Sequence, residues 1–382
     1  REPYRTYSLP LLSKGFIQGR YPEEKIFLVK EDFFESNKVT FVNNNGASSL
    51  NSENKTVLLE SGEEITYEKL LICTGGSPLQ FTIPGSDLRR IYYLRTLDDA
   101  KKIKAASESA KEAVVIGGSF IGVELAAALR ELGLSVKLLM MERYPWQTLV
   151  PEAVGNYLAQ LLEENGVSIY AQEKVVEIAG GNGLANSVTT RSGGVYEGEL
   201  FGVGIGIRLN IDFLKDSNIE IGRGVRVNQY LETNVSDVYA AGDVAVFNDL
   251  ILGTVHLTGH IENAQFQGRT AGRNMAGGHE EFSQVTAYDT EIFGTMFMFI
   301  GACDLGTEYI IRGGEPQPRG SFSFKDGKLV GALLIKPGGK EIRAVRELIE
   351  LSDSTLSSYK DRFSDPDAAL MDIVKELKDP AY

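Results

Sequence analysis

The sequence predicts an α/β fold, in which parallel strands alternate with helices, followed by an α+β region at the C-terminus. Residues 114–129, VVIGGSFIGVELAAAL, form an apolar strand, a glycine-containing turn and a helix rich in alanine and leucine. Two further apolar runs, Leu70–Cys73 and Val238–Ala241, each end beside glycine. Residues 319–335, RGSFSFKDGKLVGALLI, alternate as an antiparallel hairpin does and turn at Asp326-Gly327.

The turn after the first strand is close to a dinucleotide-binding fingerprint. Gly117 and Gly122 occupy its first and third glycine positions, and Ser119 replaces the second and can offer a hydroxyl to a phosphate. The next strand ends at Glu142, 25 residues after Gly117, where roughly 20 are expected for a ribose-binding acid. Glu142 favours NADH, whereas Arg143 beside it would attract the 2′-phosphate of NADPH. The same pattern also occurs in ordinary strand-to-helix turns.

Composition narrows the functional class. With 382 residues, 43% of them hydrophobic, and 41 glycines, the chain is expected to be a globular protein of two or three domains. A net charge of −13 disfavours nucleic acid and anionic membrane surfaces as partners. No apolar run approaches the roughly 18 residues of a membrane span, and the N-terminal residues lack an apolar signal core. We therefore expect a soluble, cytoplasmic protein.

Cysteine and histidine are scarce. Cys73 and Cys303 are too far apart in sequence to form a local redox dithiol, and we expect both to be buried structural thiols. The three histidines are His256, His260 and His279. If this stretch were helical, His256 and His260 would share one face, but too few further ligands lie near them for a metal site.

Four motifs in order give the chain a family resemblance: TGG at residues 74–76, GGSFIG at 117–122, GVGIGIRLN at 202–210 and VYAAGDVA at 238–245. Together they resemble the FAD/NAD(P)-dependent pyridine nucleotide-disulfide oxidoreductases. Within that superfamily, YSLPLLSKG, YLRTLDDA and NAQFQGRTAGRNMAG are similar to ferredoxin and rubredoxin reductases and to apoptosis-inducing-factor-like proteins. The resemblance implies two Rossmann-like dinucleotide-binding domains, with the NAD domain inserted into the FAD domain, and a C-terminal α+β domain.

The resemblance also implies the site residues. Lys14 and Glu124 would form a pair near the reactive N5 of FAD, where a cation stabilises negative charge on the reduced ring. Other positions would bind the two cofactors, FAD and NAD(P)H. Along FAD these would be Pro10 at the flavin ring, Thr74, Gly75 and Arg95 beside the cofactor, and Gly242 and Asp243 at its ribityl and pyrophosphate. Gly206 and His260 would also be cofactor-binding residues. Glycine at 259 and isoleucine at 261 replace the acid and the aromatic residue that usually flank the family histidine.

The first element expected of an FAD domain does not occur ahead of these motifs in the sequence. The first strand-turn-helix unit of an FAD domain, roughly 30 residues long, is absent before residue 1. Either the FAD domain is truncated at its N-terminus and holds FAD weakly, or further residues precede Arg1 in the whole protein. We expect FAD-binding segments at residues 1–94 and 213–282, an NAD(P)-binding domain at 95–212 and an interface-type domain with a helical tail at 283–382.

Three functions are compatible with these patterns. The first is an NAD(P)H-dependent flavoprotein reductase without a redox cysteine, passing electrons to a small iron protein, dioxygen or another small acceptor. The second is a weakly active protein whose redox state governs its association with partners, as in apoptosis-inducing-factor-like proteins. The third is a flavin-free, nucleotide-binding interaction protein. A homodimer is compatible with all three.

Overall fold

The structure is a computed structural model that describes residues 2–379. It divides into two compact units between which the chain passes repeatedly. The first unit comprises Arg1–Ser8, Glu23–Ser77 and Ile207–Gln284, and the second Leu9–Pro22, Pro78–Gly206 and Val285–Tyr382. Parallel sheets with helices occur in both units, which confirms the predicted α/β class. The four functional segments predicted from the sequence stay a prediction.

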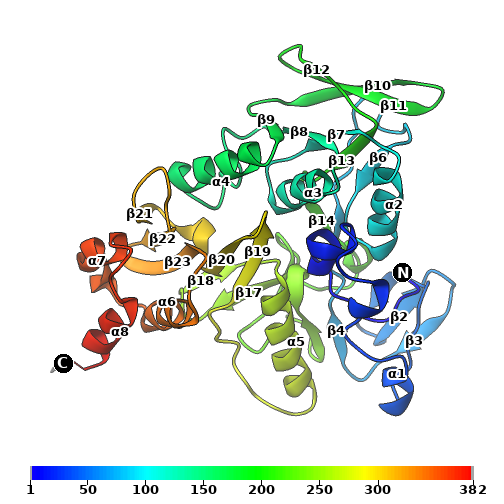
Figure 1. Cartoon of the computed structure of the whole chain (residues 1–382). Coiled ribbons are helices and arrows are strands. Elements are labelled where there is room, and N and C mark those ends of the chain that lie inside the picture. The colour runs from blue at the N-terminus through cyan, green and yellow to red at the C-terminus, as the bar shows by residue number, and fades with distance from the viewer. Residues whose placement is uncertain (1, 380–382) are drawn as a thin grey trace. The chain divides into compact units, whose positions relative to one another are not determined.

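The first unit contains several small sheets and one long helix (Figure 1). An antiparallel meander joins β1 (Ala47–Asn51), β2 (Thr56–Leu59) and β3 (Glu64–Thr66). The two predicted glycine-flanked strands, β4 (Leu70–Ile72) and β16 (Val238–Ala240), pair in parallel. The remaining elements are α1 (Phe33–Ser36), β15 (Val225–Arg226), β17 (Ala245–Asp249), β18 (Thr254–His256) and α5 (Ile261–Met275). A two-stranded ladder also joins β5 (Gly76–Pro78) and β14 (Ile207–Leu209).

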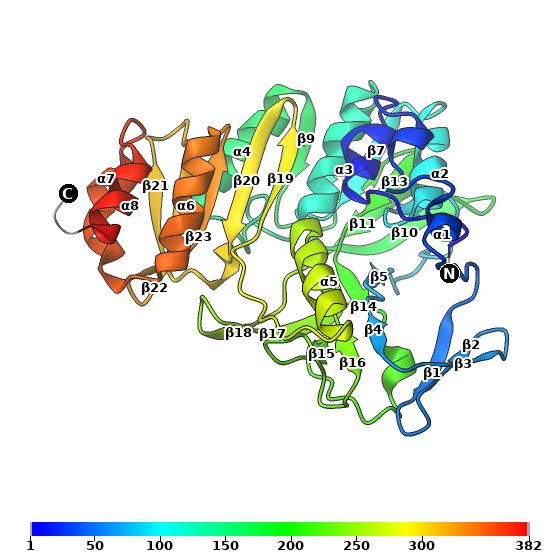
Figure 2. The same ribbon diagram turned by 90° about the horizontal axis from the view of Figure 1, so that it is seen from below.

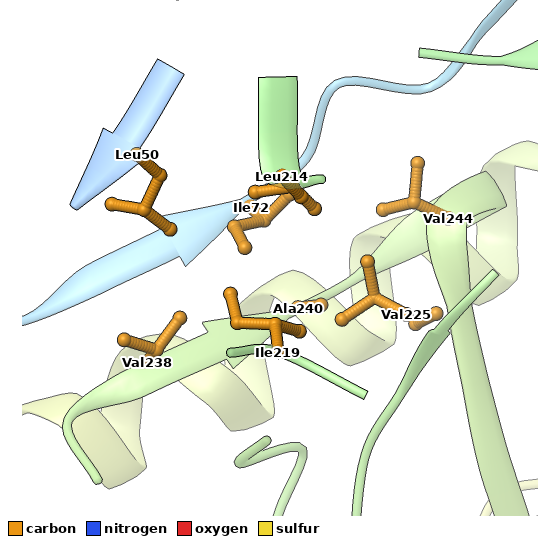
Figure 3. Close-up of a cluster of buried hydrophobic side chains, with 9 residues drawn as sticks. Leu50, Ile72, Leu214, Ile219, Val225, Val238, Ala240 and Val244 are labelled. Atoms are coloured by element: carbon orange, nitrogen blue, oxygen red, sulfur yellow. The ribbon is translucent and has the colours of Figure 1, made fainter. Parts of the chain in front are cut away.

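The core of the first unit holds the ends of β4 and β16 in place. Figure 3 shows Ile72 and Ala240, from these two strands, among apolar side chains of neighbouring segments such as Leu50, Leu214 and Val225. All nine residues of this cluster are buried. Because apolar burial contributes about 25 cal/mol per Å², this cluster stabilises the paired strands β4 and β16, which are each followed within a few residues by glycine.

The nucleotide-binding half of the second unit is a five-stranded parallel sheet in the order β6-β13-β7-β8-β9. Its strands are β6 (Ile91–Tyr93), β7 (Glu112–Ile116), β8 (Ser135–Leu139), β9 (Val167–Tyr170) and β13 (Leu200–Val203), and its helices are α2 (Leu97–Ser107), α3 (Phe120–Glu131) and α4 (Glu152–Glu164). Gly202 on β13 lets α3 pack closely, because an added Cβ would lie 2.5 Å from Leu125 Cδ2. A meander of β10 (Val175–Gly181), β11 (Leu184–Thr190) and β12 (Val195–Glu197) follows β9 along the chain.

The C-terminal half of the second unit is a five-stranded antiparallel sheet in the order β19-β20-β23-β22-β21. Its elements are β19 (Ala287–Ile292), β20 (Thr295–Gly301), β21 (Glu308–Arg312), β22 (Gly320–Lys325), β23 (Lys328–Ile335), α6 (Gly339–Leu351), α7 (Lys360–Ser364) and α8 (Leu370–Lys378). Asp326 and Gly327, with φ of 52° and 76°, make the predicted turn between β22 and β23. Helix α6 packs on β20 and β23, with α8 beside it (Figure 2).

One sequence prediction is wrong. Cys73 is exposed rather than buried, because β4 ends at Ile72, whose side chain enters the core, and the next residue lies beyond the strand. The stretch from His256 to His260 is not helical, since His256 ends β18 and His260 precedes α5, so the two histidines share no helix face. No helix among residues 2–379 combines the length and apolarity needed to cross a membrane.

Candidate functional site

The turn between β7 and α3 requires glycine at two of its predicted positions. Gly117 has a φ of 120°, and a Cβ added there would lie 2.2 Å from the Gly204 carbonyl oxygen. A Cβ at Gly122 would lie 1.9 Å from the carbonyl oxygen of Gly117. The chain therefore makes the tight turn and the close helix contact that a dinucleotide-binding fingerprint needs.

Ser119 makes a hydrogen bond to a neighbouring backbone segment at this turn. Its hydroxyl donates to the Gly204 carbonyl oxygen at 2.8 Å, so that proton is directed to the backbone beyond β13 rather than held out for a phosphate. Ser119 is also the N-cap residue of α3, and its side chain makes no capping hydrogen bond. The Ser119 side chain therefore leaves the N–H groups of the first helical turn uncapped, and such N–H groups suit an anion at a helix N-terminus.

Glu142 lies beside the same turn. A Cβ added at Gly118 would be 3.1 Å from Glu142 Oε2, so the carboxylate reaches the fingerprint backbone from the end of the neighbouring strand. Arg143 is engaged elsewhere: its Nη2 lies 3.2 Å from Glu152 Oε1 at the start of α4. Glu142 and Arg143 are the two residues that could decide between NADH and NADPH, and Glu142 is the one that lies at the turn.

Gly206, another predicted cofactor-binding residue, has a φ of 115° and lies after strand β13 of the same sheet.

Lys14 and Glu124 form an ion pair inside the second unit. Lys14 lies in the irregular helical turn Leu12–Phe16, and its Nζ is 3.6 Å from Glu124 Oε1 on α3. The carboxylate is almost fully buried, at 7% exposure. Two hydroxyls complete its shell: Ser13 donates to Oε2 at 2.5 Å and Thr290 donates to Oε1 at 2.7 Å. Such donors stabilise the ionised carboxylate against the cost of burial.

Two other predicted residues of the second unit lie near helix ends. The Pro10 carbonyl oxygen accepts from the Ser13 hydroxyl at 3.4 Å, which joins Pro10 to the segment that carries Lys14. Arg95 precedes the N-cap of α2, where Thr96 and Asp99 form a capping box, and the Arg95 N–H also donates to the Asp99 carboxylate.

The remaining predicted residues lie in the first unit around the end of β16. Gly242 and Asp243 begin the short helical turn Gly242–Val244, and the Gly242 N–H donates to Gln267 Oε1 at 2.8 Å. Gln267 Nε2 and Asn263 Oδ1 on α5 are buried and have no hydrogen-bond partner. Buried polar atoms without partners are rare, since each costs free energy. Both atoms could bind a polar group, and Gln267 is the one of the two residues that contacts Gly242.

Thr74, Gly75 and His260 are held by local hydrogen bonds. Thr74 Oγ1 donates to the Asn210 carbonyl oxygen, and Asn210 Nδ2 donates back to the Thr74 carbonyl oxygen. Gly75 follows with a φ of 58°. His260 is the N-cap of α5, and its Nδ1 accepts from the Asn263 N–H at 3.3 Å. A Cβ at Gly259 would lie 3.3 Å from Asp243 Oδ1, so glycine at 259 keeps a second acid away from that carboxylate.

Other parts of the described chain lie outside these predictions. A cavity in the first unit is lined by residues around β15 and β17, including Arg226 and Asn228, and contains no predicted site residue. Among residues 2–379, no group of three or more histidine, cysteine, aspartate or glutamate residues could hold a metal ion.

Both thiols are held in their protonated form. Burial raises the pKa of the Cys303 thiol to about 12. Cys73 as a residue is exposed, yet protein packed around its sulfur desolvates the thiolate and raises the pKa to about 11. Because the thiolate is the nucleophilic form, neither environment activates its sulfur.

Comparison with known proteins agrees with this geometry. Residues 1–268 match the model of the pyridine nucleotide-disulphide oxidoreductase family. The chain belongs to this family. Rubredoxin-NAD(+) reductase of Pseudomonas putida is 31% identical over 277 residues, 72% of each protein. NADH-rubredoxin oxidoreductase of Clostridium acetobutylicum is 31% identical over 284 residues, 74% of this chain and 69% of the relative. A ferredoxin reductase of Rhodopseudomonas palustris has a similar fold, with a TM-score of 0.90 at 23% identity over 98% of this chain and 91% of that one.

The predicted superfamily, enzyme class and cofactors are confirmed by this membership: the chain is an oxidoreductase that uses FAD and a pyridine nucleotide. The roles of the individual residues stay predictions. Sequence reasoning missed Ser13 and Thr290 at Glu124, Gln267 at Gly242 and Asn263 at His260. A sequence signal existed only for Ser13, a polar residue directly before Lys14 in an apolar stretch.

Proposed function

We propose that the chain is an NADH-dependent flavoprotein reductase that passes electrons to a small iron-containing redox protein without using a cysteine. The observation that carries the proposal is the Lys14–Glu124 pair, a cation held by a buried carboxylate on the helix that begins at the nucleotide-binding turn. Family membership and the names of the two rubredoxin-linked relatives support it.

FAD, when bound, would accept a hydride from the nicotinamide and release the electrons singly to an iron centre. Lys14 would stabilise the negative charge that develops on the reduced ring, and Glu124 would orient the ammonium group. The glycine turn and the open N–H groups of α3 would bind the pyrophosphate of the nicotinamide nucleotide. Glu142 would accept hydrogen bonds from its ribose hydroxyls.

The test measures, by stopped-flow absorbance, how fast NADH reduces the flavin in the absence of any acceptor. Lys14→Met and Glu124→Gln should each lower the limiting rate constant about 10²-fold, the usual effect of losing one electrostatic contact to the transition state. Lys102→Met, which removes an exposed lysine on α2, is the matched control. A Lys14→Met protein that keeps its flavin and the parental rate constant would overturn the proposal.

The acceptor is tested separately. Reduction of a rubredoxin, a [2Fe–2S] ferredoxin and dioxygen should be compared at equal NADH and enzyme concentrations. The proposal expects one of the two iron proteins to be reduced faster than dioxygen by at least about tenfold, with a rate that depends on ionic strength. Equal or faster reduction of dioxygen would identify an oxidase instead.

A further inference from the structure

We infer that strand β19 of the C-terminal sheet is part of the hydride-transfer site, and that Thr290 on it is a positioning residue that holds Glu124 against Lys14. This inference rests on the proposed function and adds to it. The sequence assigns the C-terminal segment no role at the cofactors. In the structure three consecutive residues of β19 contact the Lys14–Glu124 pair and the nucleotide-binding turn.

The first contact fixes the carboxylate. Thr290 Oγ1 donates to Glu124 Oε1 at 2.7 Å, and both residues are buried, at 1% and 7% exposure. The Ser13 hydroxyl takes the other oxygen, so each carboxylate oxygen has its own donor. A β-branched side chain on a strand has few rotamers. Thr290 therefore specifies the direction of the carboxylate more closely than a flexible donor would.

The second contact fixes the cation. Lys14 Nζ donates to the backbone carbonyl oxygen of Asp289, the residue directly before Thr290. The ammonium group therefore lies between the Glu124 carboxylate and a carbonyl of the same strand. Any shift of β19 changes both partners of the lysine together.

The third contact joins the strand to the nucleotide-binding turn. The Tyr288 ring meets the Phe120 ring edge to face, with centroids 5.5 Å apart, and Phe120 is the first residue of α3. Tyr288 also stacks on Phe299 of the next strand, at 5.0 Å and an angle of 1°. Alternate residues of a strand share a face, so Tyr288 and Thr290 both point toward α3, which lies along β19 (Figure 2).

A purely structural role for Thr290 predicts a different result from a positioning role. If the hydroxyl only satisfies a buried acceptor, its loss lowers stability and leaves the reactivity of Lys14 and the reduction rate unchanged. If it positions Glu124, its loss changes the lysine environment and the rate of hydride transfer, while nicotinamide binding is unaffected.

The first experiment measures flavin reduction in Thr290→Val, which removes the hydroxyl at constant shape, and in Thr290→Ser, which keeps it. Thr290→Val should lower the limiting rate constant about tenfold, the scale of a small misplacement of a reacting group. The Kd for NADH should stay within about twofold. Thr290→Ser, which keeps the hydroxyl on a less restricted side chain, should retain most of the parental rate constant. Thr295→Val, a buried threonine of the same hairpin opposite Ile292, should leave both quantities unchanged.

The second experiment needs no flavin turnover. Lys14 is acylated with N-hydroxysuccinimidyl acetate in the flavin-stripped chain, and mass spectrometry of its peptide gives the rate. Thr290→Val should accelerate acylation severalfold, and Thr290→Ser and Thr295→Val should not. If the valine variant does not hold its fold, Thr290→Ala replaces it in the same comparison.

The outcomes separate the two proposals. If Lys14→Met and Glu124→Gln slow reduction but Thr290→Val changes neither the rate constant nor the acylation rate, the inference about β19 is overturned and the proposed function stands. If Thr290→Ser is as slow as Thr290→Val, the hydroxyl does not carry the effect, which also overturns the inference. If the Lys14 and Glu124 variants reduce normally, the proposed function itself fails.

Discussion

Arg143 Nη2 lies 3.2 Å from Glu152 Oε1, while the carboxylate of the preceding residue, Glu142, reaches the backbone of the nucleotide-binding turn. Neighbouring residues of opposite charge are thus directed to different partners. The basic side chain that would recognise a 2′-phosphate is neutralised by the start of α4, and the acidic one remains beside the expected ribose position. This arrangement favours NADH over NADPH and leads to two predictions.

Glu142→Ala should weaken NADH binding about tenfold, because hydrogen bonds to a charged group contribute about 1.5–3 kcal/mol. NADPH binding should change less, since the carboxylate would also repel its phosphate. Isothermal titration with the two reduced nucleotides measures both constants. Equal losses for NADH and NADPH would show that Glu142 does not discriminate between them.

Glu152→Gln should strengthen the binding of 2′,5′-ADP, because it releases the Arg143 guanidinium to a phosphate. The Arg143–Glu152 pair is exposed, at 62% and 53%, so the gain should not exceed about fivefold and should vanish at high salt. Binding of 5′-AMP, which lacks the 2′-phosphate, is the control measurement. An equal gain for both nucleotides would point to a general change of charge rather than to Arg143.

Replacing both cysteines should leave NADH-dependent flavin reduction largely intact. Thiol pKa values of about 11 for Cys73 and about 12 for Cys303 keep both sulfurs protonated near neutral pH. Alkylation of Cys73 by iodoacetamide should accordingly rise about tenfold per pH unit between pH 7 and 10, because only the thiolate reacts. If a folded Cys73→Ser/Cys303→Ala protein is no longer reduced by NADH, a thiol takes part in the reaction and this prediction is wrong.

Arg312→Met should destabilise the C-terminal tail. The buried guanidinium donates to the carbonyl oxygens of five residues, Arg362, Phe363, Asp365, Pro366 and Ala368. Arg312 Nε also lies 2.9 Å from Glu341 Oε1. The two groups form an ion pair, but the Nε–H bond does not point at the carboxylate oxygen, so no hydrogen bond forms between them.

Removing one partner of such a buried network costs about 3–5 kcal/mol. Urea unfolding measures the loss, and limited proteolysis should cleave first between residues 352 and 370. Arg343→Met, which breaks an ion pair within α6 whose arginine is exposed, should cost at most about 0.5 kcal/mol. Similar midpoints for the two variants would contradict the role assigned to Arg312.

Local features of this protein were predictable from its residues. The turn at Asp326-Gly327 forms because both positions accept a positive φ. The strand, turn and helix around Gly117 were predicted from apolar periodicity and from the conformational freedom of glycine. These two signals involve only residues within a few positions of one another in the sequence. The family resemblance drew on the same short motifs.

The partners of Glu124 were decided by the tertiary structure. Ser13 and Thr290 are separated from it by 111 and 166 positions, and no local pattern marks either as a donor to a buried carboxylate. Cys73 shows the same limit, since an apolar run predicts a buried residue, but β4 ends at Ile72 and the residue that follows it is exposed. Periodicity and turn chemistry depend on short-range backbone preferences. The direction of one polar side chain depends on which distant segments pack against it, and only the folded chain brings those together.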